Sequence, residues 1–372
     1  MIKRIVLILA LSILPHTAAQ AITTIQIGPY LQRVSAHAAT ILLRTDLATT
    51  VTIHYRKVGA DHWKTSPSAS ASTEHRFRLT SLKKGQAYEY YLSENDDRLT
   101  MTYQFSTEKN ITKADPLKLA VFGDSGRNTT DQYAVASQIM RWQPDMILHT
   151  GDIAYYSGTT EEFISNFFEP YQALLPEVPF YLSPGNHDYI TDQAGPYKDF
   201  FEMPTAGGPS EDYYSFNYDS IHIVSLNSNL DYSVGSAMYN WLASDLTAAV
   251  TQPWIIVFFH HPPYSSGEHG STIDMQTTIV PLFEQYGVDV VLNGHDHDYE
   301  RTATINGVRY IVTGGGGHDS LYGQTNLELN PYSEKFEAVY HFLAITARYK
   351  KIKIEAINTQ GYIVDTVNLS RE

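Results

Sequence analysis

Apolar residues fall into two kinds of segment that alternate from residue 117 onward. Five short runs rich in β-branched and aromatic residues predict buried strands at 117–122, 146–150, 178–182, 254–259 and 288–292. Amphipathic stretches of helical length lie between them, at 131–142, 161–174 and 273–286. This alternation predicts a layered α/β domain in which the carboxyl ends of the strands gather at one edge.

The part of the chain before residue 117 has a different pattern, with no convincing helix. Its β-rich runs, at 39–45, 50–56, 74–79, 87–92 and 99–105, are separated by turn-forming residues. We therefore expect a small all-β sandwich domain over 22–108, a polar linker over 109–116 and an α/β domain over 117–372. Two later stretches, 302–311 and 342–367, are expected to add strands that finish a second sheet of the α/β domain.

One segment of the predicted β-sandwich resembles a known fold. Leu82, Gly85 and Tyr88 are similar to the tyrosine-corner region of fibronectin type III-like domains, although Lys84 stands where proline is common. We expect this domain to pack against the α/β domain and to shape one wall of its pocket, rather than to bind carbohydrate or a partner. Its histidines have no ligand spacing and are expected at the surface; they are His37, His54, His62 and His75.

The amino terminus indicates export. Lys3 and Arg4 precede an apolar run over 5–14, and Ala19-Gln20-Ala21 follows, which together predict a signal peptide over 1–21. The run is too short to span a bilayer comfortably, so a membrane anchor is not expected. Because the chain has no cysteine, neither lipoprotein attachment nor a disulfide is expected. The predicted location is the periplasm or the outside of the cell.

The composition and net charge of the chain limit the kinds of molecule that it is expected to bind. The 372 residues are 43% hydrophobic and 18% charged, as in a folded soluble protein. The formal net charge is −14, and removing Lys3 and Arg4 with the signal makes it −16. With no basic run in view, a nucleic-acid or anionic-membrane surface is not expected.

Metal-binding side chains follow each of the five predicted strands of the α/β domain. Four of the five turns carry glycine, which tolerates the sharp backbone there. Together the turns supply two carboxylates, a phenol, an amide and three imidazoles, a full ligand set for two adjacent metal ions. These residues are Asp124, Asp152, Tyr155, Asn186, His260, His295 and His297. The chemistry predicted is metal-assisted hydrolysis.

Read in order, the five segments resemble the signature of the calcineurin-like metallophosphoesterases. Tyr155, within Gly151-Asp152-Ile153-Ala154-Tyr155, is similar to the purple acid phosphatase branch of that family. His260-His261-Pro262-Pro263 and the segment from Gly294 to Arg301 also resemble blocks of this branch. The resemblance spans roughly residues 115 to 320 and implies an αββα sandwich.

The resemblance implies a role for each ligand. Asp124, Asp152, Tyr155 and His297 would hold ferric iron, Fe(3+). Asp152 would bridge to a second ion, Fe(2+), Zn(2+) or Mn(2+), completed by Asn186, His260 and His295. The implied activity is that of an exported acid phosphatase, in which a metal-activated hydroxide attacks small phosphate monoesters. Two histidines are candidates for protonating the leaving group by the same resemblance, His187 and His269.

Alternatives remain at this point. A phosphodiesterase could use the same metal centre, and a non-catalytic binding protein could keep the scaffold. We expect His260 rather than His261 as the ligand, because adjacent strand residues point to opposite faces. Three histidines within predicted strands are expected to be structural; they are His149, His222 and His341. The physiological substrate and the oligomeric state are not indicated.

Overall fold

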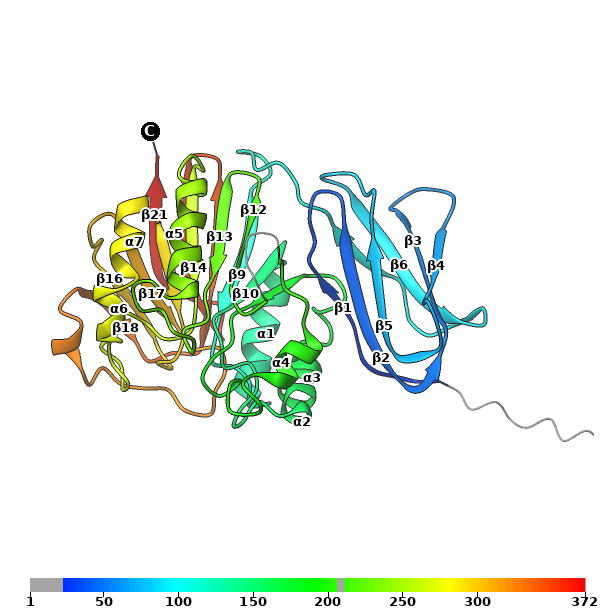
Figure 1. Cartoon of the computed structure of the whole chain (residues 1–372), viewed down its shortest axis with the longest axis horizontal. Coiled ribbons are helices and arrows are strands. Elements are labelled where there is room, and N and C mark those ends of the chain that lie inside the picture. The colour runs from blue at the N-terminus through cyan, green and yellow to red at the C-terminus, as the bar shows by residue number, and fades with distance from the viewer. Residues whose placement is uncertain (1–22, 206–210, 372) are drawn as a thin grey trace, which may run out of the picture.

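The structure is a computed structural model that describes residues 23–205 and 211–371. Figure 1 shows two parts side by side, a β-sandwich of residues 25–106 and a larger α/β part that follows it. The predicted signal peptide lies outside the described residues. Among the described helices, none is both long and apolar enough to cross a membrane.

The β-sandwich is formed by two sheets around an apolar core. One sheet has the order β1-β2-β5 (Ile25–Gln32, Ala39–Thr49 and Ser72–Leu79). The other has the order β4-β3-β6-β7 (Lys64–Pro67, Val51–Lys57, Ala87–Glu94 and Asp97–Arg98), and β8 (Tyr103–Ser106) also pairs with β6. The backbone N–H of Lys83 donates to the Tyr88 hydroxyl at 2.9 Å, which is the contact a tyrosine corner makes. One expectation fails: His75 is buried, and its Nε2 lies 3.1 Å from Thr45 Oγ1.

The α/β part contains two facing sheets. The six-stranded sheet has the order β11-β10-β9-β19-β20-β21, and its strands are Phe180–Leu182, Met146–His149, Leu117–Phe122, His341–Arg348, Lys351–Asn358 and Ile363–Ser370. The seven-stranded sheet has the order β12-β13-β14-β15-β17-β16-β18. Its strands are Tyr214–Tyr218, Ile221–Ser225, Trp254–Phe258, Val290–Asn293, Arg309–Thr313, Tyr299–Thr302 and Ser333–Glu337.

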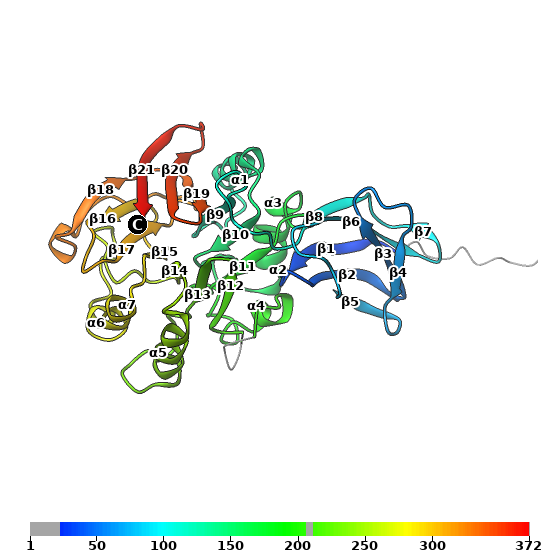
Figure 2. The same cartoon turned by 90° about the horizontal axis from the view of Figure 1, so that it is seen from above.

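Strand β14 shows how the layers are assembled. Ile256 and Phe258 belong to the large core cluster that the two sheets share, whereas Ile255 and Val257 pack in a second cluster with helices α5 (Ala237–Ala249) and α7 (Val280–Tyr286). Helix α1 (Thr130–Trp142) contributes to the first cluster and contacts β19 and β20. The layers are therefore helix, sheet, sheet, helix, and the predicted αββα sandwich is confirmed (Figure 2).

The remaining helices are short. They are α2 (Thr160–Phe163), the π-helix η1 (Ile164–Phe168), α3 (Glu169–Tyr171), α4 (Gly195–Phe200), α6 (Ile273–Thr277) and the 3-10 helix η2 (Leu327–Leu329). The predicted helix over 273–286 is thus two helices, and that over 161–174 carries a π-helical turn. Helices α4 and α5 were not predicted. For α5 the signal was present, because Met238, Leu242, Leu246 and Ala249 form a buried stripe at helical spacing.

One topological prediction was wrong. The stretch 302–311 does contribute to the seven-stranded sheet, but 342–367 does not. Strand β19 instead pairs antiparallel with β9, with Leu343 opposite Val121 and Ala347 opposite Leu117. Both sheets offer similar apolar strands, so the composition of the run does not reveal which open edge it joins.

The β-sandwich is fixed to the α/β part by buried hydroxyl groups. Tyr90 donates to the Pro176 carbonyl at 2.8 Å and Tyr30 donates to the Phe200 carbonyl at 2.6 Å. In the other direction Tyr181 donates to the Val34 carbonyl at 2.8 Å. Ile27, Tyr30 and Leu42 also join the core of the α/β part. These contacts support the expected packing role, and within the described residues they reach β11, η1, α4 and the loop before β11 rather than the predicted metal ligands.

Candidate metal centre

The predicted ligands lie in loops at the carboxyl ends of five strands, three of them neighbours in the six-stranded sheet and two of them neighbours in the seven-stranded sheet. Strands β9, β10 and β11 are parallel, and so are β14 and β15. Because parallel strands end at the same edge, the loops after them converge. Backbone hydrogen bonds join these loops: Asp124 N donates to the Gly151 carbonyl at 2.9 Å, and Gly294 N donates to the His260 carbonyl at 3.0 Å.

Three ligand positions have an unusual backbone. Asp124, Asp152 and His295 have φ of 56°, 55° and 74°, in the left-handed region that residues with a side chain rarely adopt. Such conformations persist only where the surroundings hold them, and they concentrate at functional sites. Here the His295 N–H donates to both Asp124 oxygens, at 3.0 and 2.9 Å, so one unusual turn supports another.

Two glycines make room for the carboxylates. A Cβ at Gly185 would lie 2.0 Å from Asp152 Oδ1, and a Cβ at Gly294 would lie 2.3 Å from Asp124 Oδ2. Neither position could carry any side chain without moving a carboxylate. The glycines noted in the sequence are therefore required here for close approach.

The structure brings the first group of predicted ligands together. The Tyr155 hydroxyl donates to Asp124 Oδ1 at 3.2 Å and lies 3.1 Å from His297 Nε2. His297 Nε2 is 3.7 Å from Asp124 Oδ1. All three side chains are buried.

The second group is equally close. His260 Nε2 lies 2.9 Å from Asn186 Oδ1, 3.4 Å from Asp152 Oδ2 and 3.2 Å from His295 Nδ1. Ligand atoms of Asp124, Asp152 and His260 lie within 4.8 Å of one another, so the two groups form one cluster. All seven predicted residues are thus neighbours, with Asp152 between the groups.

The electrostatics of the cluster favour cations. Burial, together with the nearby Asp152 carboxylate, raises the pKa of Asp124 above its usual range, although His260 opposes this. Burial also disfavours the charged form of Asp152, but His260, His187 and His295 hold its pKa below the usual range. Burial and the two carboxylates raise the pKa of Tyr155. Against the effect of burial, Asp152 and Asp124 in turn raise the pKa of His260 to about 9, so both carboxylates favour a neighbouring positive charge. Two buried carboxylates, a phenol, an amide and imidazoles form a donor set that fits two metal ions.

Asp188 holds two of the ligand loops in place, and the sequence reasoning did not single it out. Its carboxylate is buried and accepts from the backbone N–H groups of Ile153, Ala154 and Gly185, at distances of 2.8 to 3.1 Å. Burial and the Asp152 charge raise the pKa of Asp188 to about 7. Its place two residues after Asn186 was the available signal.

The two candidate proton donors, His187 and His269, have different hydrogen-bond partners. His187 places Nδ1 2.7 Å from the Tyr156 carbonyl, and its backbone N–H donates to Asp152 Oδ1 at 3.0 Å. His269 lies on the other side of the cluster, its ring 4.2 Å from that of His295. Its Nδ1 lies 3.0 Å from Oδ1 of the buried Asp296, whose carboxylate also accepts from the His269 backbone N–H at 2.8 Å.

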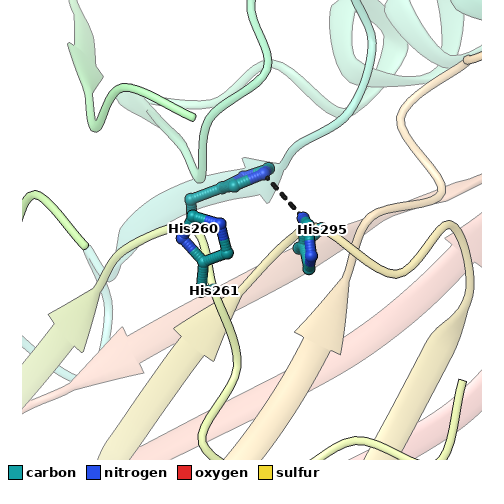
Figure 3. A group of neighbouring side chains, drawn as sticks. All are labelled: His260, His261 and His295. Carbon is teal, nitrogen blue, oxygen red and sulfur yellow. Dashed lines mark hydrogen bonds between the residues drawn. The ribbon is translucent and has the colours of Figure 1, made fainter. Parts of the chain in front are cut away.

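His261 lies closer to the cluster than expected. Strand β14 ends at Phe258, so His260 and His261 are both in the following loop, where strand alternation does not apply. Figure 3 shows both rings beside His295, and the His261 ring is 4.5 Å from the His295 ring. His261 Nδ1, however, lies 2.7 Å from Ser228 Oγ, whereas His260 faces Asp152 and Asn186. Burial and the His260 charge lower the pKa of His261 to about 3.

Two aromatic rings border the first ligand group. The Tyr322 ring stacks on His297, with 4.1 Å between ring centroids and 12° between planes. The His318 ring lies 4.5 Å from Tyr155 and 4.2 Å from His297. Tyr322 was missed because it lies beyond the sequence motifs, in a loop that only the fold brings back to the site.

Three other histidines have structural partners, as expected. His149 Nε2 lies 2.8 Å from Ser125 Oγ, and His341 Nε2 lies 3.0 Å from Thr313 Oγ1. His222 lies between Asn217 Oδ1 at 2.7 Å and Asp245 Oδ2 at 2.8 Å.

Comparisons with known proteins agree with this geometry. The family model described as calcineurin-like phosphoesterase matches residues 117–299, a range that contains all seven clustered residues. The chain contains a calcineurin-like phosphoesterase domain. Among curated relatives, purple acid phosphatase 15 of Arabidopsis thaliana is 32% identical over 289 residues, which cover 66% of this chain and 53% of the relative. Acid phosphatase type 7 of Mus musculus is 25% identical over 342 residues, covering 79% and 76%.

A solved structure supports the fold of both parts. A purple acid phosphatase from yellow lupin (Lupinus luteus) seeds matches 92% of this chain and 74% of its own, with a TM-score of 0.79 and 20% identity. At that identity the match concerns the fold alone. The chain spans about half the length of the first plant relatives it matches, at 53%, 57% and 50%. The resemblance to the purple acid phosphatase branch is confirmed.

The Gly185→Ala variant tests the close approach at Asp152. Its Cβ would displace the carboxylate, and misplacing a catalytic group by about 1 Å can lower activity by about 100-fold. We expect metal content and phosphatase activity to fall together, measured by elemental analysis and a phosphate-release assay. Gly323→Ala is the matched control, because a Cβ there meets nothing within 4 Å. Unchanged metal content in Gly185→Ala would contradict the role of this glycine.

Buried histidines predict acid sensitivity of the fold. Burial lowers the pKa of His341 from its ordinary value of 6.5 to about 4. Below pH 6.5 the unfolded chain therefore binds a proton that the folded chain refuses, so the free energy of unfolding falls as pH drops from 6.5 towards 4. The slope contributed by one such group reaches at most about 1.4 kcal/mol per pH unit.

In the His341→Gln variant this slope should decrease, as measured by denaturant unfolding at several pH values. The same substitution at the exposed His62 serves as control. Parallel pH dependence of wild type and His341→Gln would refute the assignment.

Proposed function

We propose that this protein is an exported acid phosphatase that hydrolyses small phosphate monoesters at a centre of two metal ions. The observation that carries the proposal is the convergence of seven ligand-type side chains from five loops on one buried cluster. The calcineurin-like phosphoesterase domain and the curated acid phosphatase relatives support it. Export rests on the predicted signal peptide, residues 1–21, with the periplasm or the cell exterior as the destination.

Each metal ion would have its own set of residues. Asp124, Tyr155 and His297 would hold the first ion, Fe(3+), because a phenolate and a carboxylate suit a trivalent cation. Asn186, His260 and His295 would hold the second, Fe(2+), Zn(2+) or Mn(2+), with Asp152 shared between the two. When bound, the metals would supply Lewis-acid chemistry, lowering the pKa of water and neutralising charge on the phosphoryl oxygens.

The chain itself would supply proton transfer and order. His269 would give a proton to the departing alkoxide from Nε2, because Nδ1 faces the Asp296 carboxylate. His187 contacts the Tyr156 carbonyl through its ring and the Asp152 carboxylate through its backbone N–H, and it would bind a phosphoryl oxygen or donate the proton instead. Asp188 would keep both loops in register.

A non-catalytic binding function is the less favoured interpretation, because a protein that had lost hydrolytic activity would be expected to have lost some of its metal ligands. Here all seven ligand positions are retained and clustered. A phosphodiesterase activity of the same centre is the alternative within the enzyme class, and the assay below separates the two ester types.

Turnover of an aryl phosphate monoester and of the matching diester tests the function directly. We expect the metal-loaded chain to prefer the monoester, and Asp152→Asn to abolish turnover because the shared ligand is lost. Asp231→Asn, at an exposed position away from the cluster, controls for the change of one charge. Circular dichroism of both variants checks the fold. Diester preference would select the alternative, and retained turnover in folded Asp152→Asn would refute the proposed centre.

The leaving group identifies the proton donor. An alkyl phosphate needs a proton on its departing oxygen, whereas a nitrophenyl phosphate does not. Loss of a general acid typically costs about 100-fold to 10,000-fold. We therefore expect His269→Ala to reduce alkyl phosphate turnover by this order and nitrophenyl phosphate turnover much less.

Two further variants complete this test. Asp296→Asn should reproduce the same bias more weakly, since Asp296 orients His269 and does not itself donate the proton. If His187→Ala shows the bias and His269→Ala does not, the two roles are exchanged.

A further inference from the structure

One region of the surface has a charge opposite to that of the whole chain. The sequence has 40 acidic and 26 basic residues, yet among the described residues a cleft of about 770 Å³ is lined by five cationic side chains and by no carboxylate. The cations come from residue 113, in the segment that leads to β9, and from the β19–β20 hairpin. They are Lys113, Arg348, Lys350, Lys351 and Lys353.

The strand register brings these cations onto one face. Arg348 is the cross-strand partner of Lys351, and Lys351 is in turn opposite Ser370 of β21. In the next row Lys353 lies between Thr346 and Asn368. Like charges directly opposite in a sheet are destabilising, and neutral hydroxyl and amide groups do not offset them. The fold therefore carries an unfavourable local charge arrangement here.

Of these five cations, Lys353 alone forms an ion pair within the described residues. Lys353 pairs with Glu355 at 2.6 Å, whereas Arg348 Nε donates only to the Lys113 carbonyl, at 3.4 Å. For Lys113, Lys350 and Lys351, no carboxylate of the described chain lies within ion-pair distance. Four cations thus converge on the cleft without compensation inside residues 23–205 and 211–371. Departures from local charge balance of this kind are expected at functional sites.

The cleft is separate from the metal centre. Ala347, next to Arg348, pairs with Leu117 at the beginning of β9, whereas the ligand loops follow Phe122 at its end. Six strand residues at about 3.3 Å each place the two sites on the order of 20 Å apart along the sheet. In Figure 2 the hairpin of β19 and β20 lies beside β21, the outer strand of the six-stranded sheet.

We propose that this cleft binds a compact polyanion, a small molecule that carries several phosphate or sulfate groups. Lysine is a common point-charge partner of such groups, and four of the five cations are lysines. The volume suits a ligand of metabolite size. A nucleic acid is less favoured, because single strands bind along rows of aromatic residues and the cleft offers only Tyr349. This site goes beyond the proposed hydrolysis and does not depend on it.

Calorimetric titration of the metal-loaded full chain with sucrose octasulfate tests the proposal. The probe carries sulfate rather than phosphate esters, so hydrolysis at the metal centre does not interfere. The triple variant Arg348→Gln/Lys350→Gln/Lys351→Gln should bind at least about tenfold more weakly, and wild-type binding should weaken steadily with added salt. Turnover of the aryl monoester should stay at the wild-type level, so failure of this site and failure of the hydrolase assignment are distinguishable.

The control must remove the same charge elsewhere. Lys57→Gln/Lys64→Gln/Lys83→Gln changes three exposed lysines of the β-sandwich and alters the net charge equally. Affinity close to wild type in this control, with loss in the cleft variant, supports a local site. Equal loss in both, or no binding at low ionic strength, overturns it. Tighter, cleft-dependent binding of a single-stranded oligonucleotide than of the probe would also overturn it, in favour of a nucleic-acid surface.

Discussion

The repulsion between two buried carboxylates, Asp124 and Asp152, is the constraint on which the rest of the structure depends. Their side chains are 0% and 2% exposed, where water offers almost no screening. Bringing like charges together in such a place is unfavourable unless positive charge and hydrogen-bond donors surround them. The surrounding imidazoles, the backbone N–H groups of the ligand loops and the predicted cations supply this compensation. The fold and the proposed chemistry therefore both require positive charge and hydrogen-bond donors around these two carboxylates.

Rigid surroundings are what make that arrangement possible. The two sheets of the α/β part share a continuous apolar core, and alternate residues of β14 face this core and the α5–α7 layer. A frame packed on both faces resists the relaxation that would separate the loops. Within the loops, left-handed turns at Asp124, Asp152 and His295 depend on mutual hydrogen bonds. The rigid packing of the core thus fixes the positions of the ligand loops at the strand ends.

The β-sandwich makes a different contribution. It meets the α/β part through directed bonds from tyrosine hydroxyls to backbone carbonyls, as in the contacts of Tyr30, Tyr90 and Tyr181. Such bonds fix orientation, because each buried carbonyl has few other partners. The basic cleft lies at yet another place, near the amino end of β9. Packing, catalysis and the proposed anion binding therefore occupy three separate regions.

Local patterns determined much of this protein from the sequence alone. Strand β9 was predicted to the residue, and the tyrosine corner at Tyr88 was indicated by the resemblance of its segment to fibronectin type III-like domains. Seven ligand-type residues were recognised because each follows a strand in a short motif. Their roles as metal ligands stay predictions. These features can be predicted from the sequence because the period of a strand, the residues of a turn and the chemistry of a ligand all depend on neighbouring residues.

Only the tertiary structure decided the features that depend on distant segments. It assigned β19 to the edge of β9, brought Tyr322 onto His297, and showed that Asp296 orients His269. It also placed His261 beside His295, since the loop after β14 ends the strand alternation. The cationic cleft arises in the same way, from register between strands and a distant segment. Sheet edges, ring stacking and uncompensated charge are set by contacts across the chain, and no local pattern encodes them.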